Sequence, residues 1–264
     1  MSARVRVSAV SFLNARPLVQ GLDRQPDLFD LSFDLPSTCA ARLHAGEVDL
    51  GLIPAVEYLA GDYRFVPGIA IGSYGATLSV AVFTTRPIAE IRRLALDTSS
   101  RTSAALCRIL CAKLWGIAPE FVPAAPELAG MLGVADAALV IGDPALRIDP
   151  VAHGVEKIDL GEAWRTLTGL PFVYAAWTGR PDVLGPGHLA ALAAARDAGL
   201  AAREAIAAEA ADGDPALAAA LAAYLRDNLT YTFGERDRAG LERFFELAVD
   251  VGCAPRLRPL RFYA

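Results

Sequence analysis

Residues 93–116, RLALDTSSRTSAALCRILCAKLWG, contain the pattern that decides the fold. Arg93–Asp97 predicts a β-strand, and Arg101–Trp115 predicts a helix that Gly116 and Pro119 terminate. A strand that leads into a helix is the repeating unit of parallel α/β sheets. The stretch therefore predicts an α/β protein in which short strands alternate with helices.

The same alternation occurs on both sides of this stretch. The other predicted strands are Arg4–Val10, Phe29–Leu35, Asp49–Ile53 and Ala137–Ile141, and the other predicted helices are Arg16–Leu22 and Thr38–Gly46. Two further segments, Leu78–Thr85 and Phe172–Thr178, are predicted to be extended. An Ala-rich helical stretch follows the second of them and continues to about Val251.

This order of segments predicts two lobes. One extended segment would leave the first lobe and the other would return to it, forming a two-strand hinge beside a ligand-binding cleft. We expect lobe 1 to contain residues 1–84 and 178–264, with the C-terminal helices packed on it, and lobe 2 to contain residues 85–177. A single continuous doubly wound sheet is the alternative.

The composition excludes several classes of function. The 264 residues include 25 Lys+Arg and 30 Asp+Glu, a formal net charge of −5, so the clustered positive charge that nucleic acids require is not expected. No apolar run approaches the roughly 18 residues of a membrane helix. The apolar stretch after Arg4 and Arg6 breaks at Asn14 and Pro17, too early for a signal peptide, and we expect a cytoplasmic protein.

Cysteine and histidine give no support for a metal site. The four cysteines lack CxxC spacing, and Cys107 and Cys111 are best interpreted as small apolar residues on one helix face. The three histidines, His44, His153 and His188, fall away from the strand-to-helix junctions, so neither a Ser-His-Asp nor a His-metal mechanism is supported. No phosphate-loop or dinucleotide-binding glycine pattern occurs.

Ligands of parallel α/β sheets meet the carboxyl ends of the strands, so the strand-to-helix junctions are the candidate sites. At the first junction, Asn14 offers both a donor and an acceptor and Arg16 could reach a carboxylate. A helix N-cap and a surface arginine are the structural alternatives. At the second, the backbone around Pro54 and Ala55 is the candidate, and Glu57 is expected to be structural.

The third junction, Leu96–Ser103, is the richest in polar groups. Its hydroxyl residues include Ser99, Ser100, Thr102 and Ser103, and Arg101 lies among them. A single Ser or Thr would cap the helix, so the others are surplus to capping. Free N–H groups, the helix dipole (about 0.3–1 kcal/mol) and several hydroxyls all favour an anion, which predicts an anion site.

The fourth junction is Ile141–Ala145, where Gly142 and Asp143 precede a proline. Asp-Pro commonly opens a turn, which is the structural interpretation. An Asp143 that faced an anion site could instead bind a hydroxyl or act as a base. Gly72–Ser79, which includes Ser73, and the residues around Glu162–Trp164 are weaker candidates of the same kind.

Five segments together resemble a known family. They are SFLNARPL (11–18), DLGLIPAVEY (49–58), LDTSSRTSAALCRIL (96–110), VIGDPAL (140–146) and DLGEAWRTLTGLPFVYAAW (159–177). Their sequence and order resemble the menaquinone-biosynthesis chorismate dehydratase family of the futalosine pathway, over about residues 4–180. Phe12 stands where the family commonly has Tyr, and Ala55 where a Ser often follows the Ile-Pro pair.

The resemblance implies a periplasmic-binding-protein-like fold of type II that serves as a cofactor-independent hydro-lyase. It implies conversion of chorismate, a small dicarboxylate, to 3-[(1-carboxyvinyl)oxy]benzoate and water. We interpret Asn14 and Asp143 as the catalytic candidates, and either Asp143 or the substrate's own enolpyruvyl carboxylate could be the base. The candidate substrate-binding residues are Arg16, Pro54, Ala55, Ser73, Ser99, Ser100, Arg101, Thr102, Ser103 and Gly142.

Two other functions fit the same segments. One is a non-catalytic binding protein for a small aromatic carboxylate, because the fold itself performs no reaction. The other is the related dihydroxynaphthoate-forming enzyme of the same pathway. The expected partner is a small molecule in each case, with no role for a nucleic acid or a membrane.

Overall fold

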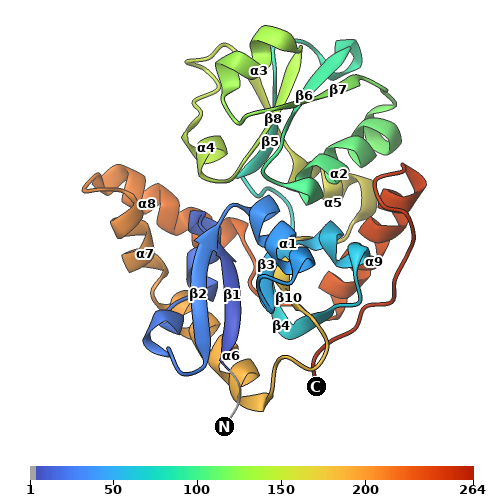
Figure 1. Ribbon diagram of the computed structural model, residues 1–264. Coiled ribbons are helices and arrows are strands. Elements are labelled where there is room, and N and C mark those ends of the chain that lie inside the picture. The colour runs from blue at the N-terminus through green and yellow to red at the C-terminus, as the bar shows by residue number, and fades with distance from the viewer. Residues whose placement is uncertain (1–3) are drawn as a thin grey trace.

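The protein is divided into two α/β lobes, as the computed structural model of residues 4–264 shows (Figure 1). Within those residues the strands form two separate five-stranded sheets, one in each lobe. Their strand orders are β2-β1-β3-β10-β4 and β7-β6-β8-β5-β9. The predicted two-lobed α/β architecture is confirmed, and the alternative of one continuous sheet is wrong.

The first lobe is built around a largely parallel sheet. Its elements are β1 (Val5–Val10), β2 (Phe29–Asp34), α1 (Pro36–Ala45), β3 (Leu50–Pro54), β4 (Arg64–Ser73) and β10 (Phe172–Gly179), with 3₁₀ helices at Leu13–Leu18, Leu22–Arg24 and Ala55–Ala60. β1 pairs in parallel with β2 and β3, whereas β10 is antiparallel to both β3 and β4. Strands β3 and β10 are buried along their whole length, as central strands covered on both faces must be.

The second lobe repeats this plan. Its elements are β5 (Val80–Thr84), a 3₁₀ turn (Ile88–Glu90), β6 (Arg93–Asp97), α2 (Arg101–Leu110) with a π-turn (Cys111–Trp115), β7 (Glu120–Ala124), α3 (Leu128–Val134), β8 (Ala137–Ile141), α4 (Gly142–Arg147), β9 (Glu156–Asp159) and α5 (Leu160–Thr168). β6 is parallel to β7 and β8, and β5 is antiparallel to β8 and β9. Gly116 adopts the left-handed conformation that ends the α2 segment, as its position predicted.

Sheet pairing corrects the predicted lobe boundaries, which were 1–84 with 178–264 for one lobe and 85–177 for the other. β5 belongs to the second sheet and β10 to the first. The chain therefore crosses between lobes at residues 74–79 and returns through α5 and the loop that follows it. The returning connection is thus helical, not extended as the sequence suggested.

Other local predictions need correction as well. The helix expected at Arg16–Leu22 is a 3₁₀ helix at Leu13–Leu18, with Pro17 inside it. Strands β4, β7 and β9 were not predicted. The Ala-rich stretch is broken into α6 (Pro186–Ala201), α7 (Arg203–Ala210), α8 (Pro215–Ala223), a π-turn (Tyr224–Asn228) and α9 (Glu235–Asp250).

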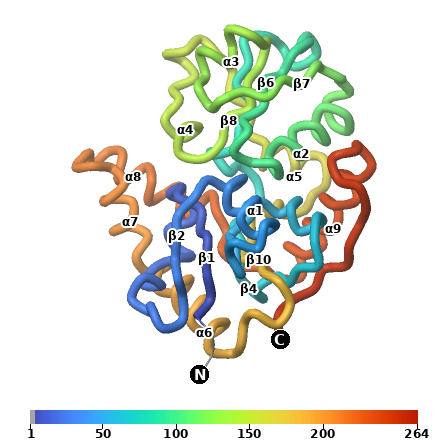
Figure 2. Tube along the Cα trace, in the orientation of Figure 1, coloured from blue at the N-terminus to red at the C-terminus, as the bar shows by residue number. Residues whose placement is uncertain are grey.

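The C-terminal helices pack mainly on the first lobe. α6 contacts β4 and the Leu13–Leu18 helix, α7 contacts the same short helix, and α9 contacts β10. α9 also reaches α2 of the second lobe. Figure 2 shows α7 and α8 as an arm on the opposite side of the molecule from α9. No helix within residues 4–264 combines the length and the apolar character needed to cross a membrane.

The packing of α6 depends on one glycine. A Cβ atom placed on Gly199 would lie 2.0 Å from the carbonyl oxygen of Pro17, so the helix and the Leu13–Leu18 segment are in backbone contact there. Ala for Gly inside a helix usually stabilises by about 0.5–1 kcal/mol. Here we expect Gly199→Ala to lower the free energy of unfolding in urea by roughly 1–3 kcal/mol, because the backbones must separate.

The matched control for this prediction is Gly187→Ala in the same helix. A Cβ atom at Gly187 meets nothing within 4 Å, so its effect should stay within about 0.5 kcal/mol. Equal effects of the two substitutions on the urea midpoint would show that contact with Pro17 does not limit the packing of α6.

Candidate active site

A small cavity lies between the lobes, where the carboxyl ends of β1 and β3 face those of β6 and β8. Its volume is about 40 Å³. Its lining residues are Val10, Phe12, Asn14, Pro36, Pro54, Ile71, Thr77, Ser79, Val80, Ser100, Ser103, Ile141, Gly142, Tyr174 and Ala175. The four junctions singled out in the sequence therefore meet at one place, as ligand sites of α/β sheets do.

The polar groups of the cavity are neutral. Asn14 Oδ1 and Thr77 Oγ1 are buried without a hydrogen-bond partner within residues 4–264. The hydroxyls of Ser100 and Ser103 lie 3.2 Å apart, and the Tyr174 hydroxyl lies 3.0 Å from Ser73 Oγ. No Asp, Glu, His, Lys or Arg is among the lining residues of the described chain. Buried polar atoms without partners are uncommon, so this set is suited to a polar ligand.

The first turn of α2 gives the cavity its electropositive side. Ser100 caps the helix by accepting a 3.4 Å hydrogen bond from the Ser103 N–H. The remaining N–H groups of the first turn have no intrahelical acceptor, and the helix dipole adds a partial positive charge. Ser99 Oγ, directly before the cap, is also buried and has no partner in the described part of the chain. This arrangement suits a carboxylate.

Asp97 holds this turn against the neighbouring strand. Its carboxylate accepts hydrogen bonds from the N–H groups of Ser99, at 2.8 Å, and Ile141, at 3.3 Å. Burial raises the pKa of Asp97, and the bonds from Ser99 and Ile141 offset that increase only in part. The sequence analysis did not select Asp97, although its place at the end of a buried strand was the available signal.

Polar contacts join the lobes around the cavity. The Leu13 N–H donates to Asp143 at 3.0 Å, and the Ser37 N–H donates to the Ser99 carbonyl at 2.9 Å. Two more contacts join the Ala55–Ala60 helix to α2. The Val56 N–H donates to Thr102 Oγ1 at 3.0 Å, and Arg101 donates to Glu57 at 2.9 Å.

These contacts change the interpretation of three predicted site residues. Ser99, Thr102 and Asp143 are not among the lining residues, and each makes a hydrogen bond to the opposite lobe; their contact with substrate stays a prediction. Burial raises the pKa of Asp143, and its bond from the Leu13 N–H offsets this only in part. Ala55 and Ser73 are fully buried beside the lining residues Pro54 and Tyr174. The structure brings Asn14, Pro54, Ser100, Ser103 and Gly142 together at the cavity.

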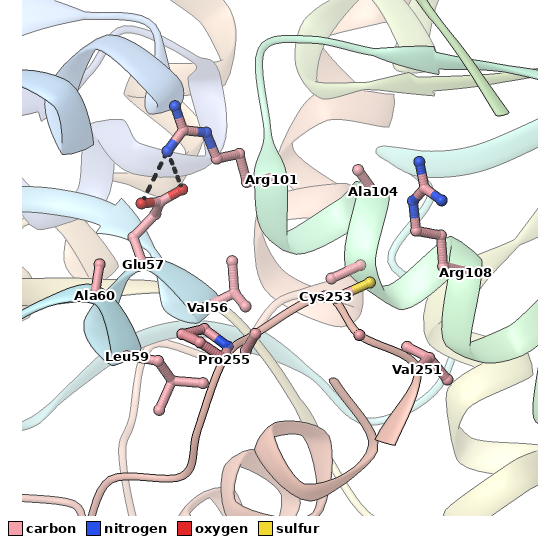
Figure 3. Close-up of a pocket in the computed structure, with 13 residues that line it drawn as sticks. Val56, Glu57, Leu59, Ala60, Arg101, Ala104, Arg108, Val251, Cys253 and Pro255 are labelled. Carbon is pink, nitrogen blue, oxygen red and sulfur yellow. Dashed lines mark hydrogen bonds and ion pairs between the residues drawn. The ribbon is translucent and has the colours of Figure 1, made fainter. Parts of the chain in front are cut away.

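The two predicted arginines lie away from the cavity. Arg16 forms an ion pair with Glu209 at 3.1 Å on the surface. Arg101 points into a more open groove that α2 shares with the Ala55–Ala60 helix and residues 251–255 (Figure 3). There both oxygens of the buried Glu57 carboxylate accept from Arg101. The sequence offered no means of pairing either arginine with a distant glutamate.

Glu57 is held by both lobes. It is 5% exposed and also accepts a 2.8 Å contact from His44 Nε2, within its own lobe. Burial alone would raise the pKa of Glu57, but His44 and Arg101 together outweigh that effect and lower it. The ionised carboxylate therefore contributes to the contact between the lobes.

Several cavity residues were missed or weakly indicated. Thr77 and Ser79 lie in the 74–79 crossing, a segment that was only a weak candidate, and Tyr174 lies in β10. Asp159 fixes the crossing by accepting from the N–H groups of Thr77, at 3.1 Å, and Leu78, at 2.6 Å. A segment that joins two lobes must pass the cleft between them, and this could have indicated Thr77 and Ser79 as cavity residues. No group of three metal-ligating side chains occurs within the described chain.

The fold and the cleft define the class of protein. The chain is similar to protein AF1704 from Archaeoglobus fulgidus, with a TM-score of 0.71 and 20% identity over 95% of this chain and 98% of that one. It is also similar to the alkanesulfonate-binding protein SsuA from Xanthomonas axonopodis pv. citri, with a TM-score of 0.69 and 14% identity over 96% and 95%. The protein has the two-lobed fold of periplasmic binding proteins.

The sequence comparisons define the family. The model of a family described as menaquinone biosynthesis matches residues 5–250. A chorismate dehydratase from Thermus thermophilus is 30% identical over 92% of this chain and 99% of that protein. The chain belongs to this menaquinone-biosynthesis family, and the resemblance found in its motifs is confirmed.

The contact between Glu57 and Arg101 yields a testable prediction. Arg101→Met leaves a buried carboxylate with one partner fewer, so we expect it to lower the free energy of unfolding by about 1 kcal/mol at pH 7. Because the pKa of Glu57 is lowered by folding, the stabilisation is present above the ordinary glutamate pKa of about 4.3. It should disappear as the pH falls through the lower pKa of the folded state.

Urea unfolding at pH 7 and near pH 3 checks this prediction. Arg108→Met is the control, because Arg108 lines the same groove two turns along α2 and has no carboxylate partner within residues 4–264. It should show no such dependence on pH. A difference between wild type and Arg101→Met that stays constant between the two pH values would contradict the role of Glu57.

Proposed function

We propose that the protein is a chorismate dehydratase that converts chorismate to 3-[(1-carboxyvinyl)oxy]benzoate and water. The observation that carries the proposal is the 30% identity to the Thermus thermophilus enzyme over nearly the whole of both chains. The interlobe cavity supports it independently, because neutral polar groups line it at the places where a small dicarboxylate needs partners.

The walls of the cavity match the two halves of the substrate. One carboxylate would accept from the first-turn N–H groups of α2 and from the hydroxyls of Ser100 and Ser103. The ring would lie against apolar side chains, among them Phe12 and Ile71. Gly142 has a left-handed φ of +67°, and a Cβ atom there would lie 2.8 Å from the Phe12 ring, so glycine allows Phe12 to cover this side.

The reaction is a redox-neutral elimination. A base takes the proton from ring carbon 3, the C–H electron pair becomes a ring double bond, and the bond between carbon 4 and its hydroxyl breaks. The hydroxyl and the proton leave together as water, and the ring becomes aromatic. The driving force is therefore in the substrate, and the protein must orient it, exclude water and guide one proton.

We assign the base to the enolpyruvyl carboxylate of the substrate. Within residues 4–264 no carboxylate or imidazole lines the cavity, and Asp143 is engaged by the Leu13 N–H behind its wall. Asn14 would orient the substrate and its departing hydroxyl, since its amide lines the cavity and its Oδ1 has no partner among the described residues. This assignment makes the protein a cofactor-independent hydro-lyase.

Incubation with chorismate tests the proposed activity. We expect the ultraviolet absorbance of the aromatic product to appear, and Asn14→Ala to reduce turnover by about 100-fold while chorismate binding is retained. Binding without turnover by the wild-type protein would favour a binding protein for an aromatic carboxylate. Neither binding nor turnover would favour the dihydroxynaphthoate-forming relative.

Asp143→Asn decides between the two candidate bases. The amide oxygen can still accept from the Leu13 N–H, so the lobe contact is kept. We expect turnover within about 5-fold of wild type, whereas loss of a true general base costs about 10²–10⁴-fold. A loss of that size, with an unchanged melting temperature, would transfer the role of base to Asp143.

A further inference from the structure

We propose that Tyr224, from the C-terminal arm, is a positioning residue for the dehydration and acts by fixing the direction in which the Ser79 hydroxyl donates. The inference rests on the proposed function and adds to it a residue that lies outside the five sequence motifs described above. Tyr224 is the first residue of the π-turn after α8, and it is 2% exposed.

The π-turn is fastened to the crossing segment that lines the cavity. The Tyr224 hydroxyl donates to Ser79 Oγ at 2.8 Å, and Asn228 Nδ2 donates to the Ala76 carbonyl at 2.9 Å. Figures 1 and 2 show α8 leading from the outer arm toward the middle of the molecule, where the lobes meet. π-turns within helices are frequent at functional sites.

The hydrogen bond from Tyr224 occupies one of the three positions around Ser79 Oγ, so the Ser79 proton cannot point toward Tyr224. A serine hydroxyl has one proton to donate and two lone pairs that accept. Because Tyr224 donates to Ser79 Oγ, the Ser79 proton is not used in that bond, and Ser79 Oγ donates no hydrogen bond within residues 4–264. The side chain of Ser79 lines the cavity. The proton is therefore available to a ligand there.

Tyr224 remains a donor throughout the neutral pH range. Burial raises its pKa, and its contacts with Ser79 and Asn14 offset that effect only in part. Tyr224 thus stays a donor to Ser79, a residue that lines the cavity, at neutral pH.

This arrangement has a use in the elimination. Negative charge develops on the departing oxygen as the bond to carbon 4 breaks, and a preorganised hydroxyl donor stabilises such charge. Ser79 would give that hydrogen bond without losing its proton, and the water formed takes the proton removed from carbon 3. Tyr224 neither gains nor loses a proton; it prevents Ser79 from turning its proton away from the substrate.

If Tyr224 had a purely structural role, phenylalanine could replace it. A second buried tyrosine in the same region, Tyr231, offers a comparison. Tyr231 is 3% exposed, and its buried hydroxyl has no hydrogen-bond partner within the described chain. It does not line the cavity. Tyr231→Phe is therefore a matched control for the loss of a buried phenol hydroxyl a short distance along the chain.

The test is a double-mutant cycle on single-turnover rates with chorismate. We expect Tyr224→Phe to reduce the rate about 10-fold with less than about 3-fold change in KM, and Ser79→Ala to reduce it about 100-fold. In the Ser79→Ala background, Tyr224→Phe should cause no further loss, because Tyr224 acts through Ser79. Tyr231→Phe should keep the wild-type rate, and melting temperatures should confirm folding of each variant.

Each other outcome overturns the inference. An unchanged rate for Tyr224→Phe, an equal loss in both backgrounds, or a similar loss for Tyr231→Phe would each mean that Tyr224 does not orient Ser79. In these cases the wild-type protein still converts chorismate, and the proposed function stands. A wild-type protein that does not convert chorismate removes the proposed function and this inference together.

Discussion

The first turn of α2 has to meet two demands at once. Ser100 and Ser103 face the cavity, while Ser99, Arg101 and Thr102 accept or donate across the gap to the first lobe. The residues that bind the opposite lobe are thus interleaved with those that would bind the ligand. Because one rigid turn carries both sets of residues, the contact that brings the lobes together also sets the position of the anion site.

Strand-to-helix junctions were predictable because they follow from local rules. A parallel strand brings its carboxyl end to a common edge, so Asn14, Pro54, Ser100 and Gly142 could be expected to meet before any contact was known. The positions of Arg16 and Arg101 could not be predicted, because they depend on distant partners. The partner of Arg101 is 44 residues away, and no local rule indicates which of two charged ends will be buried.

The Ala-rich C-terminal region illustrates a second limit. Its composition predicted helices and packing, and most of α6, α7 and α8 does that. Composition says nothing about where a helix is interrupted, and the functional candidate Tyr224 lies at such an interruption. The role of the crossing at residues 74–79 was hard to predict for a related reason. Short irregular segments have no hydrophobic periodicity that could reveal them. Tertiary contacts hold this crossing in place: Asp159 accepts from the Thr77 N–H, and Asn228 of the π-turn donates to the Ala76 carbonyl.

A neutral cavity is an advantage for the proposed chemistry. A carboxylate paired with a guanidinium has a lowered pKa, and such a carboxylate is a poor base. Arg101 is paired with Glu57 outside the cavity. Among residues 4–264, no Lys, Arg or His lines the cavity. With the other carboxylate of the substrate at the first turn of α2, the enolpyruvyl carboxylate would meet no cation in the cavity. The enolpyruvyl carboxylate would therefore keep the basicity it needs to remove the proton from carbon 3, so turning Arg101 away from the cleft serves the reaction as well as the closure of the lobes.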